Sequence, residues 1–293
     1  MSDQPSPFAE LPRRPAWVAL AAPVGGYVVG GALALLAARV LESTIGMTAI
    51  TAALVMLLVS LGAVAACLWI AARSGGAEAW SLGLDRLDLP SAAAWTGLIA
   101  LPAVALAWAA LAGTDATTAV NIPAPLQPAG PEAAFGVPGP PIGFDASVVV
   151  SLIAFCVAPA IATELALRGL ALPALSASIG RGGAAVVTAL LTPAPFALLA
   201  SSEQGGPITG AALLAGLGIS FVYLRTADLY PGIATLALGL GLAFGLSLGW
   251  STAGVATVAV ASSALAVGSA RALVSAWPAA FEERRFGASP ARP

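Results

Sequence analysis

The strongest constraint on the fold is a series of apolar stretches, each about as long as a membrane-spanning helix. A helix needs about 20 mainly apolar residues to cross the hydrocarbon core of a bilayer. Charged residues make up only 9% of this 293-residue chain, whereas a water-soluble domain carries roughly 25%. The sequence therefore predicts an all-α fold, a polytopic bundle of about eight transmembrane helices, at residues 16–38, 47–72, 91–112, 146–168, 182–201, 207–225, 231–249 and 252–274.

Polar and proline-rich segments divide the chain between these runs. The loop with seven prolines cannot form a regular helix, because proline breaks the hydrogen-bond ladder. We expect this loop to be irregular and to lie outside the cell. The predicted organisation is a cytoplasmic tail at 1–15, three spanning helices within 16–112, the proline-rich extracytoplasmic loop at 113–145, core helices at 146–250, a last spanning helix at 251–276 and a cytoplasmic tail at 277–293.

The arginines predict the orientation of the helices. All twelve basic residues are arginine, and with a cytoplasmic N-terminus only Arg39 falls on the outer side. Cytoplasmic loops of membrane proteins carry an excess of positive charge. We therefore expect both termini in the cytoplasm. The lack of lysine and the many alanines are typical of a GC-rich bacterial genome, which places the protein in a bacterial plasma membrane.

Small residues predict where helices pack, and an amphipathic segment predicts where the chain is anchored at the membrane surface. Glycines at every fourth position, Gly26 with Gly30 and then Gly241, Gly245 and Gly249, let helices approach closely in lipid. The loop at 73–90 alternates apolar with charged residues. We expect that loop to lie at the membrane interface.

The residue types that are missing exclude several kinds of chemistry. The chain has no histidine, so it has no histidine-based metal site, no Ser-His-Asp triad and no histidine base. Cys67 and Cys156 lie within apolar runs, which favours packing over a disulfide or a metal site. A net charge of −2 gives no sign of a nucleic-acid partner. We expect no cofactor and no metal.

Two charged residues inside one predicted span are the clearest candidates for a special role. Ionisable groups cost roughly 2.5–3.5 kcal/mol each at the centre of a spanning helix. Glu164 and Arg168 are four residues apart, so they share a helix face and can pair. Pro159, one turn earlier, is expected to kink this helix. The simplest interpretation is a structural ion pair near the cytoplasmic end.

Around this pair the sequence resembles the CPBP family, which comprises CAAX-type and bacteriocin-processing (Abi) intramembrane proteases. Members carry Glu-Glu-x-x-x-Arg on one helix, Phe-x-x-x-His on the next and His-x-x-x-Asn on a later one. Residues 158–175 are similar to the first motif region, Phe196 to the start of the second, and residues 223–231 to the entry to the third. The resemblance covers 145–250 and implies a CPBP-like core.

The resemblance fails at the reactive positions. Thr163 replaces the first glutamate, which in the family activates water, whereas Glu164 and Arg168 match the rest of the motif. Ala200 replaces the histidine of the second motif. In the third motif, Thr235 replaces the histidine and Gly239 the asparagine. Peptide hydrolysis needs a base and oxyanion donors, and these replacements remove them.

Glu164 is a poor substitute for the missing base. Adjacent residues point about 100° apart around a helix, so its carboxylate faces away from the position of Thr163. Ser201 and Glu203 are predicted at the outer face, across the membrane. We therefore expect no catalytic residue among these degenerate positions.

The sequence favours a catalytically inactive pseudoprotease that binds membrane lipids, a prenylated or other lipidic ligand, or the membrane helix of a partner protein. Three alternatives stay open: an active endopeptidase that uses displaced residues, a transporter, and a scaffold subunit of a membrane complex. A transport path normally shows more intramembrane polar residues than this chain carries.

Overall fold

The computed structural model describes residues 14–44, 49–74, 82–84, 88–111, 146–193, 205–247 and 252–276. The regular structure of these residues is helical throughout. Its elements are α1 (Val18–Thr44), α2 (Ala49–Arg73), α3 (Leu89–Leu111), α4 (Ala146–Leu152), the π-helical segment η6 (Ile153–Val157), α5 (Ala158–Glu164), the π-helical segment η7 (Leu165–Ala171), α6 (Leu172–Leu191), α8 (Gly205–Thr226), α9 (Tyr230–Ser247) and α10 (Thr252–Ala276).

The helices have the length and surface of a membrane protein. Four apolar stretches are long enough to cross a bilayer: Ala53–Arg73, Val149–Leu191, Thr209–Thr226 and Ala253–Ser275. Val18–Leu33, Leu89–Val104 and Tyr230–Gly245 are shorter apolar helices. Large apolar side chains such as Leu20, Leu101 and Phe221 are exposed on the outside of the bundle, where lipid is the expected solvent. The predicted all-α polytopic fold is confirmed.

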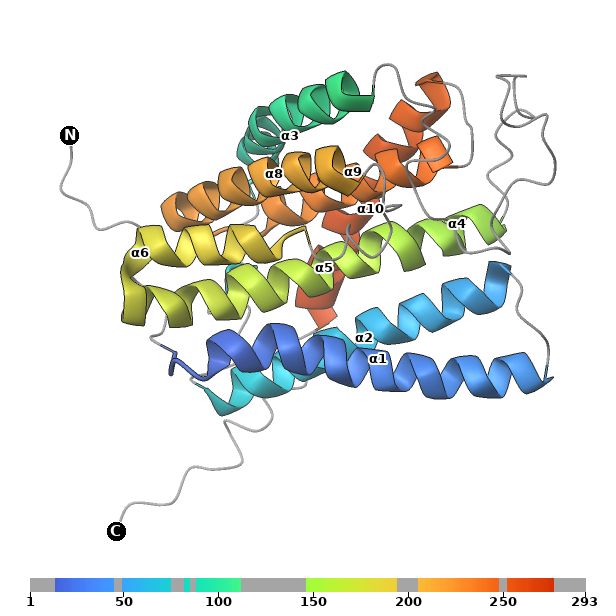
Figure 1. Ribbon diagram of the computed structural model, residues 1–293, viewed down its shortest axis with the longest axis horizontal. Coiled ribbons are helices and arrows are strands. Elements are labelled where there is room, and N and C mark those ends of the chain that lie inside the picture. Colours follow the sequence, from blue (N-terminus) through green and yellow to red (C-terminus); the bar gives the residue numbers. More distant parts are fainter. Residues whose placement is uncertain are drawn as a thin grey trace, which may run out of the picture.

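One long helical run forms the centre of the bundle (Figure 1). The run from α4 through α5 crosses the molecule, with the α1–α2 hairpin packed on one side and with α8 and α9 on the other. α3 packs on α8 and α9, and α10 packs on α9 and η6. Almost every side chain between Ser151 and Ala174 is buried, so this run is surrounded by the other helices and not by lipid.

The central run is longer than the predicted span at 146–168. Helical structure continues to Ile179, and the chain reverses direction at Gly180, where φ is 77° and ψ is 164°. Only glycine adopts such angles without strain. The second part of α6 then runs back along the bundle (Figure 1). The predicted end at Arg168 was therefore wrong, whereas the start of the next span near residue 182 agrees with the structure.

The two π-helical segments explain how this run continues past its prolines. η6 ends directly before Ala158 and Pro159, and η7 ends directly before Leu172 and Pro173. In each segment the hydrogen bond reaches back five residues: the N–H of Ala158 donates to Ile153 and that of Leu172 to Leu167. A widened turn relieves the clash and the missing donor that a proline imposes on an α-helix. Pro159 therefore sits within a continuous run.

Small residues hold two helix pairs together. A methyl group at Gly26 would lie 3.4 Å from the Cβ of Ala63, and Gly30 lies directly against the backbone of α2. On the other side, a methyl group at Gly241 would lie 2.9 Å from the Cα of Ala259 and one at Gly245 3.2 Å from that of Val255. These glycines pack as predicted, at the α1–α2 and α9–α10 interfaces. Gly249 lies outside the described residues.

The short segment Leu82–Leu84 inserts into one end of the bundle. Gly83 accepts a hydrogen bond of 3.0 Å from the N–H of Leu229, and the carbonyl of Leu84 accepts one of 3.0 Å from the Tyr230 hydroxyl. Leu82 is 2% and Leu84 5% exposed. These leucines fill a space beside the α8–α9 turn, so their side chains contact protein, and the place of the 73–90 loop at the membrane interface stays a prediction.

Arg14 fastens the chain that enters α1 at the same end. Its Nη1 donates a hydrogen bond of 3.0 Å to the Ser74 hydroxyl, just after α2. The guanidinium is almost completely buried, and this burial lowers the pKa of Arg14 from its ordinary value. The contact fixes where both helices of the α1–α2 hairpin meet the end of the bundle.

Candidate functional site

The candidate residues Thr163, Glu164 and Arg168 lie at the junction of α5 and η7, near the middle of the long central run. All three are buried: Thr163 is 6% exposed, and both charged residues are 0% exposed. π-helical turns are rare and occur frequently at functional sites. Here one encloses Arg168 and follows directly on Glu164.

Arg168 is the centre of a polar cluster. Its Nη1 donates a 2.7 Å hydrogen bond to Glu164 Oε1, which is also an ion pair. Its Nη2 donates to the Thr192 hydroxyl at 2.7 Å and to the carbonyl oxygen of Gly216 at 2.9 Å. The Ser220 hydroxyl lies 3.4 Å from Nε and 3.3 Å from Nη2. One side chain thus joins η7 to both α6 and α8.

The hydroxyl groups of this cluster are themselves held in place. Thr192 donates to the carbonyl of Thr188 at 3.0 Å, and Ser220 donates to that of Gly216 at 2.8 Å. The hydroxyls of Thr188 and Ser220 lie 3.2 Å apart across the α6–α8 interface. Because the hydroxyls of Thr192 and Ser220 donate their protons to fixed partners, their oxygens are oriented to accept hydrogen bonds from Arg168. Such bonds are strong in a low-dielectric interior. We call Glu164, Arg168, Thr188, Thr192, Gly216 and Ser220 the arginine cluster.

Two glycines make the close packing around the arginine cluster possible. A methyl group on Gly216 would lie 2.6 Å from the Thr192 Oγ1, the oxygen that Arg168 binds. A methyl group on Gly232, in the first turn of α9, would collide with the Glu164 carboxylate and lie 2.8 Å from the Cγ2 of Ile219. The second carboxylate oxygen, Oε2, has no hydrogen-bond partner. The packing therefore leaves no room for a substrate at that oxygen.

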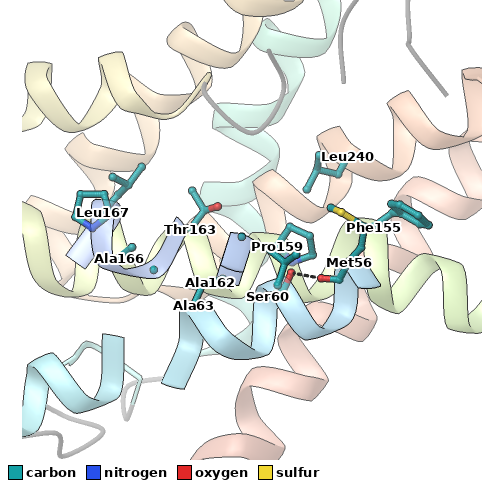
Figure 2. A pocket seen from close by; sticks show the side chains of 14 residues that line it. Met56, Ser60, Ala63, Phe155, Pro159, Ala162, Thr163, Ala166, Leu167 and Leu240 are labelled. Carbon is teal, nitrogen blue, oxygen red and sulfur yellow. Dashed lines mark hydrogen bonds between the residues drawn. The ribbon is translucent and has the colours of Figure 1, made fainter. Parts of the chain in front are cut away.

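The other side of the central run lines a cavity of about 400 Å³. Figure 2 shows Thr163 among the residues that line it. The cavity lies between α1, α2, the central run and α9, and most of its wall is apolar. Its lining residues are Pro23, Gly26, Gly31, Met56, Val59, Ser60, Ala63, Phe155, Pro159, Ala162, Thr163, Ala166, Leu167 and Leu240. We call this space the Thr163 cavity.

The structure separates Thr163 from Glu164, although the two are adjacent in sequence. Thr163 lines the cavity and Glu164 does not. The carboxylate of Glu164 instead points to Arg168 and Gly232. The helix geometry that argued against Glu164 as a replacement base is therefore present in the folded chain.

The remaining degenerate positions that the structure describes do not line the Thr163 cavity. The Thr235 hydroxyl donates a 2.7 Å hydrogen bond to the carbonyl of Pro231 in its own helix, α9. Thr235 and Gly239 do not line the cavity, although Leu240 of the same helix does. Phe196 and Ala200 lie outside the described residues.

In the part of the chain that the structure describes, the site combines a paired glutamate and arginine with an apolar cavity. The described residues contain no cluster of three or more histidine, cysteine or carboxylate side chains that would hold a metal ion. Cys67 and Cys156 are buried free cysteines. Glu164 and Arg168 neutralise each other within the arginine cluster. The Thr163 cavity offers an apolar wall with hydroxyl groups, which suits an uncharged ligand.

Sequence reasoning identified the charged pair but not its surroundings. Ser220 and Gly216 lie in an apolar helix without any obvious motif. The only feature of the sequence that points to them is a glycine and a hydroxyl residue four positions apart. Thr188 and Thr192 each bond to a carbonyl of their own helix, and Thr192 also accepts from Arg168.

Comparison with known proteins identifies the region that contains this site. Residues 145–242 match the model of a protein family described as type II CAAX prenyl endopeptidase Rce1-like. The match begins just before α4 and ends within α9, so it contains the central run, the arginine cluster and the α9 positions. No curated protein and no solved structure matches the chain.

Proposed function

We propose that this chain, whose residues 145–242 match the family model of Rce1-like type II CAAX prenyl endopeptidases, is a pseudoprotease of the CPBP family. It keeps the membrane-embedded core of the family and has lost peptide-bond hydrolysis. Its remaining role is to bind a lipid, a prenyl group or a partner's membrane helix.

The observation that carries this proposal is the position of Thr163. At this motif position the family has the glutamate that activates water, and in this chain the residue lines a cavity of about 400 Å³. A threonine hydroxyl cannot deprotonate water near neutral pH, because it is not a base. The cavity therefore offers space for a ligand next to the position of the lost base.

The neighbouring acid does not replace this base. Glu164 is held by Arg168 at 2.7 Å, and its second oxygen is packed against Gly232. A general base must reach the proton that it removes within hydrogen-bond distance. Glu164 faces away from the cavity and is engaged in an ion pair, so an active peptidase would need another base.

Hydrolysis assays test the loss of activity. The purified protein in lipid nanodiscs would be incubated with prenylated CaaX-type peptides and with a library of membrane-spanning substrates. We expect no turnover, because the loss of one base or oxyanion donor commonly costs factors of about 10² to 10⁴. Turnover that Glu164→Gln abolishes would instead establish an active endopeptidase with displaced residues.

A variant with the family residues restored is the matched control. It carries Thr163→Glu, Ala200→His, Thr235→His and Gly239→Asn. Turnover by this variant alone would locate the loss of activity at these four positions. Its fold is checked separately by thermal unfolding, because a buried glutamate and two histidines also need supporting contacts.

We further propose that the protein lies in the bacterial plasma membrane with both termini in the cytoplasm and residues 113–145 outside. The arginine distribution supports this orientation. Single cysteines introduced at Ser289 and at Thr117, in a Cys67→Ala and Cys156→Ala background, would be labelled with a membrane-impermeant reagent. We expect labelling of intact cells at residue 117 only. The opposite pattern would reverse the orientation.

A further inference from the structure

The hydroxyl of Thr163 differs from most of the described hydroxyls within the helices, although that of Ser262 also lacks a hydrogen-bond partner. Polar side chains of spanning helices commonly bond to the carbonyl four residues earlier. Such bonds are made by Ser60, Thr96, Thr188, Thr192, Ser220 and Thr235. No hydrogen bond joins Thr163 to any residue that the structure describes. The side chain is nevertheless only 6% exposed and lines the cavity.

An unpartnered hydroxyl beside an apolar cavity indicates the polarity of a ligand. A buried hydroxyl without a partner is costly in an apolar environment. A ligand that accepts a hydrogen bond would remove this cost. Ser60 is the other hydroxyl of the wall, and it donates to the Met56 carbonyl at 3.1 Å. Among the described residues of the wall, the Thr163 hydroxyl is therefore the one free donor.

The charge of the wall restricts the ligand further. None of the fourteen described residues that line the cavity is charged. The nearest ionised groups in the sequence, Glu164 and Arg168, pair with each other on the other side of the central run. A charged ligand would have to leave water without a counter-charge, which is strongly unfavourable. The ligand is therefore uncharged.

The volume restricts the shape of the ligand. About 400 Å³ corresponds to roughly thirteen groups of the size of a water molecule, at about 30 Å³ each. A spanning helix is roughly 10 Å wide and 30 Å long, so it is far too large for the cavity. One linear chain fits, and a partner's helix does not.

We propose that the Thr163 cavity binds a single-chain, uncharged lipid whose carbonyl oxygen accepts a hydrogen bond from the Thr163 hydroxyl. The chain has roughly a dozen carbons, from the volume above. This inference rests on the proposed binding function, and it specifies the ligand by one chain, no charge and one acceptor. Monoacylglycerols have one chain and no charge, and their ester carbonyl supplies the acceptor.

A set of matched ligands tests this proposal. The probe is a photoreactive monolauroylglycerol, added to the full-length protein in nanodiscs, with the cross-linked peptide identified by mass spectrometry. The competitors are monolauroylglycerol, dodecane and dodecyl phosphate. We expect cross-links to residues of the cavity wall, with strong competition by the ester, weaker competition by the hydrocarbon and little by the anion.

Two threonine variants separate the hydrogen bond from general effects on folding. Thr163→Val keeps the shape and removes the donor, so monolauroylglycerol should bind about fivefold more weakly, the value of one ordinary hydrogen bond, with dodecane unchanged. Thr235→Val removes a hydroxyl that bonds within its own helix and should leave both affinities unchanged. Ala166→Leu reduces the cavity and should weaken both ligands together.

The possible failures are distinguishable. Equal affinity of natural protein and Thr163→Val for the ester, or competition by dodecyl phosphate as strong as by the ester, would overturn the lipid class but leave a cavity that binds chains. A photoreactive probe that forms no cross-link to the cavity wall would overturn this inference. The proposed function would then depend on a ligand or a partner's helix that binds elsewhere.

Discussion

Thr163 and Glu164 are adjacent in sequence but belong to two regions of opposite character. Glu164 lies in the arginine cluster, where the guanidinium of Arg168 binds oxygen atoms from three helical segments. Thr163 lies at a cavity with an almost entirely apolar wall. Both regions are buried, and both are built on the same central run. The difference is that one region is filled and hydrogen-bonded, whereas the other is open.

This difference separates the part of the motif that serves the fold from the part at which we propose that a ligand binds. The matched residues, Glu164 and Arg168, stabilise the contact of three segments. The replaced residue, Thr163, faces the space in which a ligand fits. A chain that loses hydrolysis but keeps its membrane fold is expected to retain the first pair and to vary the second position.

The largest effect is expected from breaking the ion pair. Arg168→Met removes every hydrogen bond that the guanidinium donates within the arginine cluster and leaves Glu164 uncompensated. Removing one partner of a buried pair costs about 3–5 kcal/mol. The double variant Glu164→Gln with Arg168→Met carries no buried charge and should be more stable than Arg168→Met alone. Equilibrium unfolding in mixed micelles measures both.

The neighbouring Thr163→Val is the control for this comparison. It removes a hydroxyl without a protein partner, so its effect on stability should be close to zero or slightly favourable. The ion pair itself is tested by comparing Glu164→Gln, Arg168→Met and the variant with both changes. If the effects of the two single changes add up in that variant, Glu164 and Arg168 do not interact. A loss for Thr163→Val as large as that for Arg168→Met would show that the two sides of the run are not different.

The fold class and the charged pair could be predicted from sequence because each follows from a local pattern. Apolar runs of about 20 residues identify spans, and a spacing of four residues identifies a helical pair. The end of the central run was not predictable in this way. Pro173 reads as a helix end, but the π-helical turn η7 in front of it lets the helix continue to Ile179.

The partners of Arg168 could not be predicted because they depend on how helices distant in sequence pack. Gly216 and Ser220 contribute to the cluster across 48 and 52 residues of sequence. A serine within an apolar helix usually bonds to its own backbone, and Ser220 does so as well. The cavity has the same origin, since it is formed by α1, α2, the central run and α9 together.

A medium effect is expected from filling the contact between α6 and α8. Gly216→Ala places a methyl group 2.6 Å from the Thr192 Oγ1, so it should displace an Arg168 partner and cost about 1–3 kcal/mol. Gly210→Ala is the matched control in the same helix, because a methyl group there meets nothing within 4 Å. It should be neutral or stabilising by up to about 1 kcal/mol. Equal effects in thermal unfolding would show that α8 does not need a glycine at the arginine cluster.

The smallest effect compares one hydroxyl from each region. Thr188→Val removes a contact of 3.2 Å between α6 and α8, and hydrogen bonds between spanning helices contribute about 0.6 kcal/mol on average. Ser60→Ala removes a hydroxyl at the cavity that bonds only within α2, so its cost should be near zero.

The difference in unfolding free energy between Thr188→Val and Ser60→Ala is resolvable by unfolding in mixed micelles with replicate measurements. Ser220→Ala in combination with Thr188→Val tests the origin of this difference. If the Thr188–Ser220 contact carries the effect, the double variant is less destabilised than the sum of the single variants. An equal loss of unfolding free energy for Ser60→Ala and Thr188→Val would contradict the comparison. It would show that hydroxyls at the cavity wall and in the arginine cluster stabilise the bundle equally.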